Sequence, residues 1–147
     1  MSRAISSRQI VLAEDNPADV GLVREALREH HVACDLRVIA DGEEVLAFLA
    51  RLDRDNRLPC PDLLLLDLSL PRYDGREILK YLRASERCGQ TPVVVLSSSD
   101  WIEDREAAAK NAAVHYFKKP SSLAQFLKLG VIIKDVMEMR RKGAGRE

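Results

Sequence analysis

Five short apolar runs, each followed by a longer stretch with helical spacing, constrain the fold of this chain more than any other feature. Most are rich in Val, Ile or Leu, and they cover residues 10–13, 36–39, 63–66, 93–96 and 114–117. Short continuous apolar runs are typical of strands buried on both faces, as in a parallel sheet. The repeated strand–helix alternation therefore predicts an α/β fold, with one parallel sheet, right-handed crossovers and helices on both faces.

Capping residues predict where the helices begin, because Asn, Asp and Ser side chains accept hydrogen bonds from free amides at a helix start. Pro is also well suited to the first helical turn. The expected helices are 17–29 after Asn16, 43–52 after Asp41, one after Gly75, one capped by Ser99 or Asp100 that ends near Lys110, and a last one from Ser121 or Ser122 to Arg141. A polar loop covers 51–61, and the tail 142–147 is expected to be disordered.

Length and charge limit the class of protein. The 147 residues fit a single domain, 1–147, with a core over about 9–140. The formal net charge is zero, which gives no electrostatic reason to expect a nucleic-acid partner.

The three cysteines, Cys34, Cys60 and Cys88, are widely spaced and form no metal-ligand motif such as C-x-x-C. We expect reduced thiols in a cytoplasmic protein. The apolar stretch 63–66 is too short to cross a membrane, and residues 1–9 lack the apolar core of a signal peptide.

Chemically active side chains follow four of the five predicted strands. Ligands bind open α/β sheets beyond the C-terminal ends of the strands, where the strand order reverses. The residues at these ends are Glu14 and Asp15, then Asp67, then Ser97 and Ser98, then Lys118, Lys119 and Pro120. Carboxylates, a hydroxyl and an ammonium group should therefore meet at one edge of the sheet.

Carboxylates that lie close together repel one another and need a cation. A hard divalent ion, Mg²⁺ or Mn²⁺ in its place, suits oxygen ligands and leaves a position for a phosphoryl oxygen. We expect Asp15 and Asp67 as ligands, Glu14 acting partly through water, and the Ser69 backbone carbonyl as a further ligand. Asp67 would also be the nucleophile, because an aspartate can form an acyl phosphate.

The phosphoryl group needs positioning and compensation of its charge. Lys119 would pair with one phosphoryl oxygen, and Ser97 would donate a hydrogen bond to another. Each residue alone has an ordinary interpretation: a solvated acidic loop, a turn aspartate, a surface lysine or an uninformative serine. The prediction depends on their joint placement at the strand ends.

Four motifs at these strand ends resemble the receiver domains of two-component response regulators over about residues 9–140. They are V-L-A-E-D-N-P-A-D (11–19), L-L-L-L-D-L-S-L-P-R-Y-D-G (63–75), V-V-V-L-S-S-S-D (93–100) and Y-F-K-K-P-S-S (116–122). The resemblance implies a flavodoxin-like fold with strand order 2-1-3-4-5. It implies a phosphoacceptor at Asp67, an acidic metal-binding pair at Glu14 and Asp15, a switch hydroxyl at Ser97, a phosphate-contacting Lys119 and a switch aromatic at Tyr116.

The same resemblance implies a cis peptide bond between Lys119 and Pro120, which only an X-Pro bond makes accessible. The alternative is a trans proline that merely starts the last helix. Ser98 stands where the family commonly has Ala or Gly. Ser69 and Ser99 occupy positions that tune how long the phosphoryl group lasts.

A finer resemblance concerns the partner. The E-D-N-P-A-D start, the loop 51–61, the P-R-Y-D-G-R-E turn and the K-K-P-S-S-L-x-x-F end look like the small regulators that pair with phytochrome histidine kinases. This implies a phytochrome-type kinase as partner. The chain ends soon after the last predicted helix, so we expect output through protein contact or onward phosphotransfer.

The last helix carries two apolar stripes at helical spacing. One should pack on the sheet and consists of Leu123, Phe126, Leu127, Ile133 and Met137; the other consists of Leu129, Ile132, Val136 and Met139. Because exposed apolar patches mark interfaces, we expect the second stripe to form a homodimer. The alternative is one broad core-facing helix.

Three other functions remain to be weighed. A flavin-binding electron carrier of this fold would need a phosphate loop after the first strand, but Glu14 and Asp15 would repel an anion. A phosphohydrolase with an aspartyl nucleophile commonly has a second aspartate where Ser69 stands. A pseudo-receiver that binds partners without phosphorylation would not need the intact set of Asp67, Ser97 and Lys119.

Overall fold

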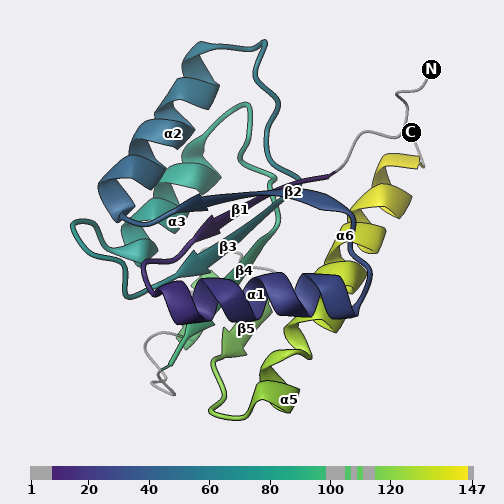
Figure 1. Cartoon of the computed structure of the whole chain (residues 1–147). Coiled ribbons are helices and arrows are strands. Elements are labelled where there is room, and N and C mark those ends of the chain that lie inside the picture. The colour runs from purple at the N-terminus through teal and green to yellow at the C-terminus, as the bar shows by residue number, and fades with distance from the viewer. Residues whose placement is uncertain (1–7, 99–104, 107–108, 111–114, 146–147) are drawn as a thin grey trace.

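The computed structural model describes residues 8–98, 105–106, 109–110 and 115–145. Its centre is a five-stranded sheet of order β2-β1-β3-β4-β5, and all four strand pairs are parallel (Figure 1). The strands are β1 (Arg8–Ala13), β2 (Cys34–Ile39), β3 (Leu63–Asp67), β4 (Val93–Ser97) and β5 (His115–Lys118). The flavodoxin-like α/β fold is confirmed, and each predicted run lies within a strand apart from residue 114, which is outside the described residues.

Three of the helices begin at caps that the sequence indicates. The helices are α1 (Pro17–Glu29), α2 (Gly42–Arg54), α3 (Gly75–Ala84), α5 (Leu123–Phe126) and α6 (Leu129–Gly145). The side chains of Asn16, Asp41 and Ser122 accept backbone hydrogen bonds at three of these starts. The helix predicted after Ser99 or Asp100 lies mostly outside the described residues, of which 105–106 and 109–110 are helical.

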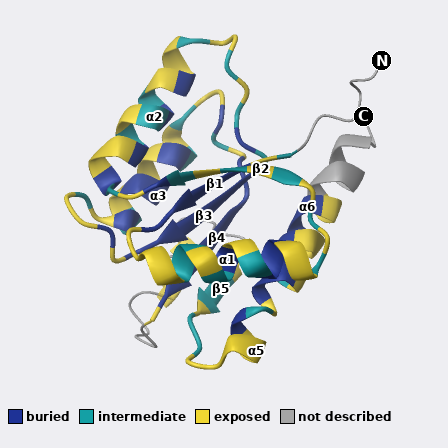
Figure 2. Ribbon diagram, viewed as in Figure 1, coloured by how far each residue is buried: buried dark blue, intermediate teal, exposed yellow. Residues whose placement is uncertain are grey.

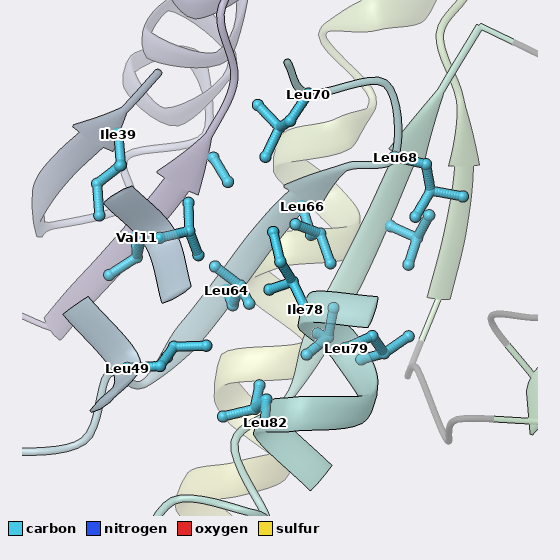
Figure 3. Close-up of a cluster of buried hydrophobic side chains, with 14 of the residues drawn as sticks. Val11, Ile39, Leu49, Leu64, Leu66, Leu68, Leu70, Ile78, Leu79 and Leu82 are labelled. Atoms are coloured by element: carbon cyan, nitrogen blue, oxygen red, sulfur yellow. The ribbon is translucent and has the colours of Figure 1, made fainter. Parts of the chain in front are cut away.

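Helices cover both faces of the sheet, and each face has its own buried cluster (Figures 1 and 2). Figure 3 shows the cluster between the sheet and the pair α2–α3, in which Leu64 and Leu66 of β3 meet Ile78, Leu79 and Leu82. The opposite face packs on α1, α5 and α6. β3 and β4 are buried along their whole length, as expected for central strands.

The last helix is broken, in contrast to the continuous helix that the sequence predicts. Leu127 and Lys128 separate α5 from α6, and Gly130 N–H donates to the Leu127 carbonyl in a tighter turn. A Cβ at Gly130 would lie 2.6 Å from the Ala26 carbonyl oxygen and would also overlap the His30 ring. The break therefore lets the backbone of α6 approach α1 at a residue without a side chain.

Two further expectations for this region are wrong. Leu123 is 56% exposed rather than packed on the sheet, because α5 is a single short turn. The backbone is helical as far as Gly145, so 142–145 do not form the predicted disordered tail.

The loop that follows α2 is fastened to the segment after α3. Arg87 Nη1 donates to the Leu52 carbonyl at 2.7 Å, and Arg87 also donates to the carbonyls of Asp55, Asn56 and Leu58. Cys60 and Cys88 form a disulfide with their Cα atoms 5.6 Å apart. The expectation of three thiols is therefore wrong for this pair. The two cysteines are 28 residues apart in the sequence, and only the fold brings them together.

Cys34 remains a thiol. Partial burial, with a smaller contribution from the charge of Asp35, raises the pKa of this thiol above its ordinary value. Among the helices of the described residues, none combines the length and hydropathy needed to span a bilayer.

Candidate functional site at the ends of the strands

The C-terminal ends of the strands enclose a hollow of about 520 Å³. Asp67 is the last residue of β3, Glu14 and Asp15 follow β1, and Lys119 follows β5. The lining consists of Glu14, Asp15, Asn16, Asp19, Asp67, Ser69, Ser98, Lys119, Pro120 and Ser121. The structure thus brings the predicted acidic residues and lysine into one site.

Glu14, Asp15 and Asp67 form a carboxylate cluster in which one oxygen from each residue lies within 4.8 Å of the others. Glu14 is 1% exposed and Asp67 is 3% exposed, whereas Asp15 is open to solvent. Unscreened carboxylates at this separation repel strongly when all are ionised. The cluster therefore favours any cation that can enter it.

Lys119 compensates part of this charge. Its Nζ lies 2.8 Å from Glu14 Oε1, 2.9 Å from Asp19 Oδ2 and 3.3 Å from Asp67 Oδ2. Burial lowers the pKa of Lys119, but the hydrogen bonds to Glu14 and Asp19 and the charge of Asp67 outweigh burial and raise it above its ordinary value. Lys119 is therefore a fixed positive charge at the centre of the site.

The carboxyl group of Glu14 has a pKa far above its ordinary value. Burial is the main cause, and the neighbouring Asp67 adds to it, so that the pKa of Glu14 rises to about 7 despite the hydrogen bond from Lys119. The Asn16 N–H also donates to Glu14 Oε2 at 3.2 Å. Near neutral pH, Glu14 is consequently poised between its protonated and ionised forms.

Asp67 is oriented by the backbone. The Ser69 N–H donates to Asp67 Oδ1 at 2.9 Å, which leaves Asp67 Oδ2 facing Lys119. A short loop after a central strand thus fixes the rotamer of the carboxylate. The Ser69 carbonyl stays a predicted metal ligand.

The predicted switch residues lie on β4 and β5. Ser97 ends β4 and is buried, and its carbonyl accepts a hydrogen bond of 2.7 Å from the Lys119 N–H. Ser98 lines the hollow. Tyr116 of β5 is partly buried against the cluster beneath α2 and α3, with the Arg105 guanidinium 5.5 Å from its ring centre.

The predicted cis peptide bond is wrong, because the bond between Lys119 and Pro120 is trans. The trans form is favoured by about 0.5–1 kcal/mol for an X-Pro bond. The backbone bond from Lys119 to Ser97 extends the β4–β5 pairing by one residue, and from there the lysine reaches the carboxylates. A trans bond is therefore compatible with this position of Lys119.

Sequence reasoning missed Asp19. It lies in the first turn of α1 and contacts Lys119 across 100 residues of chain. The available signal was position: the first turn of the helix after β1 adjoins the same edge of the sheet as Glu14 and Asp15.

The predicted dimer stripe is not a continuous exposed surface. Leu129 and Val136 are buried in the cluster beneath α1 and α6, so their assignment to an interface is wrong. Ile132 packs partly against that cluster, and Met139 is 64% exposed. Leu129 and Val136 therefore belong to the core-facing side of α6.

Both the family model and a curated relative that match this chain are response regulators. The family model of the response regulator receiver domain matches residues 10–129. The response regulator Rcp1 of Synechocystis sp. is 35% identical over 120 residues, which is 82% of each protein.

Solved structures agree in fold. The phosphorylated cyanobacterial phytochrome response regulator RcpA has a TM-score of 0.78 at 34% identity, covering 88% of this chain and 93% of its own. The Mn²⁺-bound form of Rcp1 has a TM-score of 0.75 at 34% identity, covering 84% and 88%. The bacteriophytochrome response regulator RtBRR has a TM-score of 0.70 at 31% identity, covering 83% and 75%.

Proposed function

The chain belongs to the response regulator receiver domain family, and on this premise we propose that Asp67 accepts a phosphoryl group from a histidine kinase. The observation that carries the proposal is the position of Asp67, which lies beside Lys119 within a carboxylate cluster at the strand ends. Phosphoryl transfer depends mainly on positioning and on electrostatic stabilisation, and this site supplies both.

The residues fit a divalent metal ion. Glu14, Asp15 and Asp67 offer only oxygen ligands, and together with Asp19 they outnumber Lys119 in the lining of the hollow, which leaves a local excess of negative charge. Mg²⁺ or Mn²⁺ would be held by Glu14, Asp15 and Asp67, with the Ser69 carbonyl as a further ligand. When bound, the ion would neutralise charge on the phosphoryl oxygens.

In the transfer itself, an Asp67 oxygen forms a bond to phosphorus while the bond between phosphorus and the kinase histidine nitrogen breaks. The leaving imidazole takes up a proton from solvent. Lys119 pairs with a phosphoryl oxygen in place of part of its present contact with the carboxylates, and the Ser69 N–H keeps Asp67 oriented. By these contacts the domain assists its own phosphorylation and the later hydrolysis of the acyl phosphate on Asp67.

The response is a two-state switch. In the phosphorylated state Ser97 donates a hydrogen bond to the phosphoryl group, Ser98 borders it, and Tyr116 turns inward. The buried position of Ser97 and the half-buried position of Tyr116 support this assignment. Phosphorylation shifts the equilibrium only through its different interactions with the two states.

The kinase partner that the relatives suggest is a phytochrome-type histidine kinase in the cytoplasm. The phytochrome response regulator RcpA and the bacteriophytochrome response regulator RtBRR support this pairing through their similarity to the chain. Neither nucleic acid nor a membrane is part of the proposed function.

A homodimer through α6 remains part of the proposal, with a revised contact surface. Val131 is 45% exposed and Met139 64% exposed. At 100° per residue, the partly exposed Ile132 lies about 20° around the helix from Met139, and Val131 lies about 80° from Met139. These three side chains replace the buried Leu129 and Val136 as the interface.

The decisive experiment is intact-mass measurement after incubation with acetyl phosphate and Mg²⁺. The unmutated protein should gain one phosphoryl group, and Asp67→Asn should gain none. The modified protein should lose the group in neutral hydroxylamine, as acyl phosphates do. A protein that gains no mass, or a variant that gains as much, would instead favour a pseudo-receiver that binds partners without phosphorylation.

A further inference from the structure

A second hollow, separate from the strand-end site, lies between the edge strand β2 and helix α2. Its volume is about 560 Å³, and it shares no lining residue with the hollow around Asp67. A neighbouring hollow of about 400 Å³ lies towards the loop after α2. Arg37, Phe48 and Arg51 line both, so the two hollows adjoin at these side chains, and together they are called here the β2–α2 groove.

The β2–α2 groove carries a local excess of positive charge. Three exposed arginines, Arg37, Arg51 and Arg54, line it together with two acids, Glu44 and Asp55, of which Asp55 pairs with Arg57. Within the described part of the chain, neither Arg51 nor Arg54 makes an ion pair, and the Arg37 guanidinium stacks 4.8 Å from the centre of the Phe48 ring. The whole chain has no net charge, so the positive charge of these arginines is local. Arginine side chains favour anionic groups.

One side of the groove is an open strand edge. Among the described strands β2 pairs only with β1, and the Ile39 carbonyl accepts the Glu14 N–H on that side. The other edge of β2 has no neighbour among the described strands, and Arg37, Val38 and Ile39 of β2 line the groove together with the following Ala40. An unpaired strand edge can take up an additional extended chain through backbone hydrogen bonds.

The far end of the groove is apolar and held in shape. Its lining there includes Val11, Leu52, Leu58, Pro59 and Pro61. Arg87 binds four carbonyls between residues 52 and 58, and the disulfide of Cys60 and Cys88 joins the same loop to the body of the domain. A side chain can therefore enter a preformed pocket without the cost of ordering its wall.

We propose that the β2–α2 groove binds an extended acidic segment of a partner protein. The segment adds to the free edge of β2, places its carboxylates against Arg37, Arg51 and Arg54, and seats one apolar side chain under the loop. A small anion would use only the arginines. The strand edge and the apolar pocket, which lie beside the arginines, favour a peptide.

The test uses fluorescence anisotropy with the full unphosphorylated chain. The probe is a labelled eight-residue peptide of alternating Glu and Val, and the comparison peptide has Lys in place of Glu. We expect saturable binding of the acidic peptide alone, and binding should weaken as salt is added. Arg51→Glu and Arg54→Glu should each lower the affinity about tenfold.

The matched control is Arg24→Glu, which reverses one exposed arginine on α1, on the other face of the sheet, and should leave the affinity unchanged. N-methylation of alternate peptide groups should also weaken binding about tenfold if the segment pairs with β2. Amide shifts in NMR spectra should then concentrate at residues 36–40.

Equal binding of the Lys peptide, or unchanged affinity in both groove variants, would overturn the proposal. So would competition by inorganic pyrophosphate together with insensitivity to N-methylation, which would mark a small-anion site. None of these outcomes depends on whether Asp67 accepts a phosphoryl group.

Discussion

Lys119 lies among three carboxylates, so a cation that enters the site competes with its ammonium group for them. Its ammonium group contacts Glu14, Asp19 and Asp67, so it is the positive charge of the metal-free site. A divalent ion among the same carboxylates would take over that role. Lys119 would then be available to a phosphoryl oxygen, so metal binding and phosphorylation should support each other.

The raised pKa of Glu14 predicts how stability depends on pH. The folded protein holds this proton up to a pKa of about 7, compared with the ordinary 4.5, so it binds the proton more tightly than the unfolded chain. Stability from this group is complete below about pH 4.5 and falls as pH rises to about 7. Thermal unfolding of metal-free protein should therefore show a loss on the order of 1–3 kcal/mol between about pH 5 and pH 8.

Glu14→Gln is the control, because it cannot ionise and should flatten this dependence. Mg²⁺ should stabilise the unmutated protein more at about pH 8 than at about pH 5, since the ion competes with the proton. An equally steep loss in Glu14→Gln would assign the pH dependence to another group.

Asp19 should restrain Lys119 in the metal-free site. Replacement by Asn removes one negative charge and leaves only a weaker, uncharged acceptor for Lys119, so acetyl phosphate should modify Asp67 about two- to tenfold faster at saturating Mg²⁺. The affinity for Mg²⁺ should fall over the same range, because the cluster loses negative charge. Rates from intact mass and affinities from titration measure the two effects.

Glu25→Gln is the matched control for Asp19, because Glu25 lies on the same helix and pairs with Arg28 instead of Lys119. This variant should leave both quantities unchanged. A slower reaction in Asp19→Asn at saturating metal would show that Asp19 helps to position Lys119 rather than to compete for it.

At the scale of elements, we expect a glycine-to-alanine substitution to have opposite effects on stability in two helices. Gly130→Ala would place a methyl group into the Ala26 carbonyl and the His30 ring, and should destabilise the protein by about 2–4 kcal/mol. Gly21→Ala adds a methyl group with nothing within 4 Å, in the middle of α1, and should stabilise by about 0.5–1 kcal/mol. Denaturant unfolding of both variants checks this; equal effects would contradict the close approach of α6 to α1.

The loop after α2 has two independent fastenings, Arg87 and the disulfide of Cys60 and Cys88. Hydrogen exchange at residues 55–62 should therefore change little when the unmutated protein is reduced. In Arg87→Ala, reduction should speed this exchange about tenfold or more, because both fastenings are gone. Rapid exchange in the reduced unmutated protein would show that the disulfide alone holds the loop.

Strands, first helices and caps could be predicted because they depend on local pattern. Asn16 and Asp41 cap the expected helices, and β3 begins at the expected residue. The break at Leu127 and Lys128 was not predicted, although Gly130 is a local signal of a weakened helix, because the contact of the Leu127 carbonyl with His30 of α1 depends on packing.

At the scale of the whole molecule, the site could be predicted because parallel strands place their C-terminal ends together. Glu14, Asp67 and Lys119 meet for this reason. The Cys60–Cys88 pairing depends on how two loops pack in three dimensions, and nothing in the spacing of these residues specifies it. The position of Asp19 in the first helical turn places it near the site, but its contact with Lys119 depends on packing.

Association of whole molecules through α6 can be tested with charges on its exposed side. Val131→Glu and Met139→Glu together should convert a dimer to a monomer in light scattering while leaving the thermal midpoint nearly unchanged, because both side chains are exposed. Val136→Glu is the contrasting variant: it should unfold the protein, since Val136 is buried. A double variant that stays dimeric would exclude this face.

The hydrogen bonds of Arg87 bear on how the chain matures. Each of its four partners is a backbone carbonyl, so the contacts can form as soon as the chain folds and need no oxidant. We expect them to bring the segment with Cys60 beside Cys88 while both are still thiols. The covalent bond should then follow a shape that already exists, so that a chain made in a reducing environment should reach its native loop without waiting for oxidation.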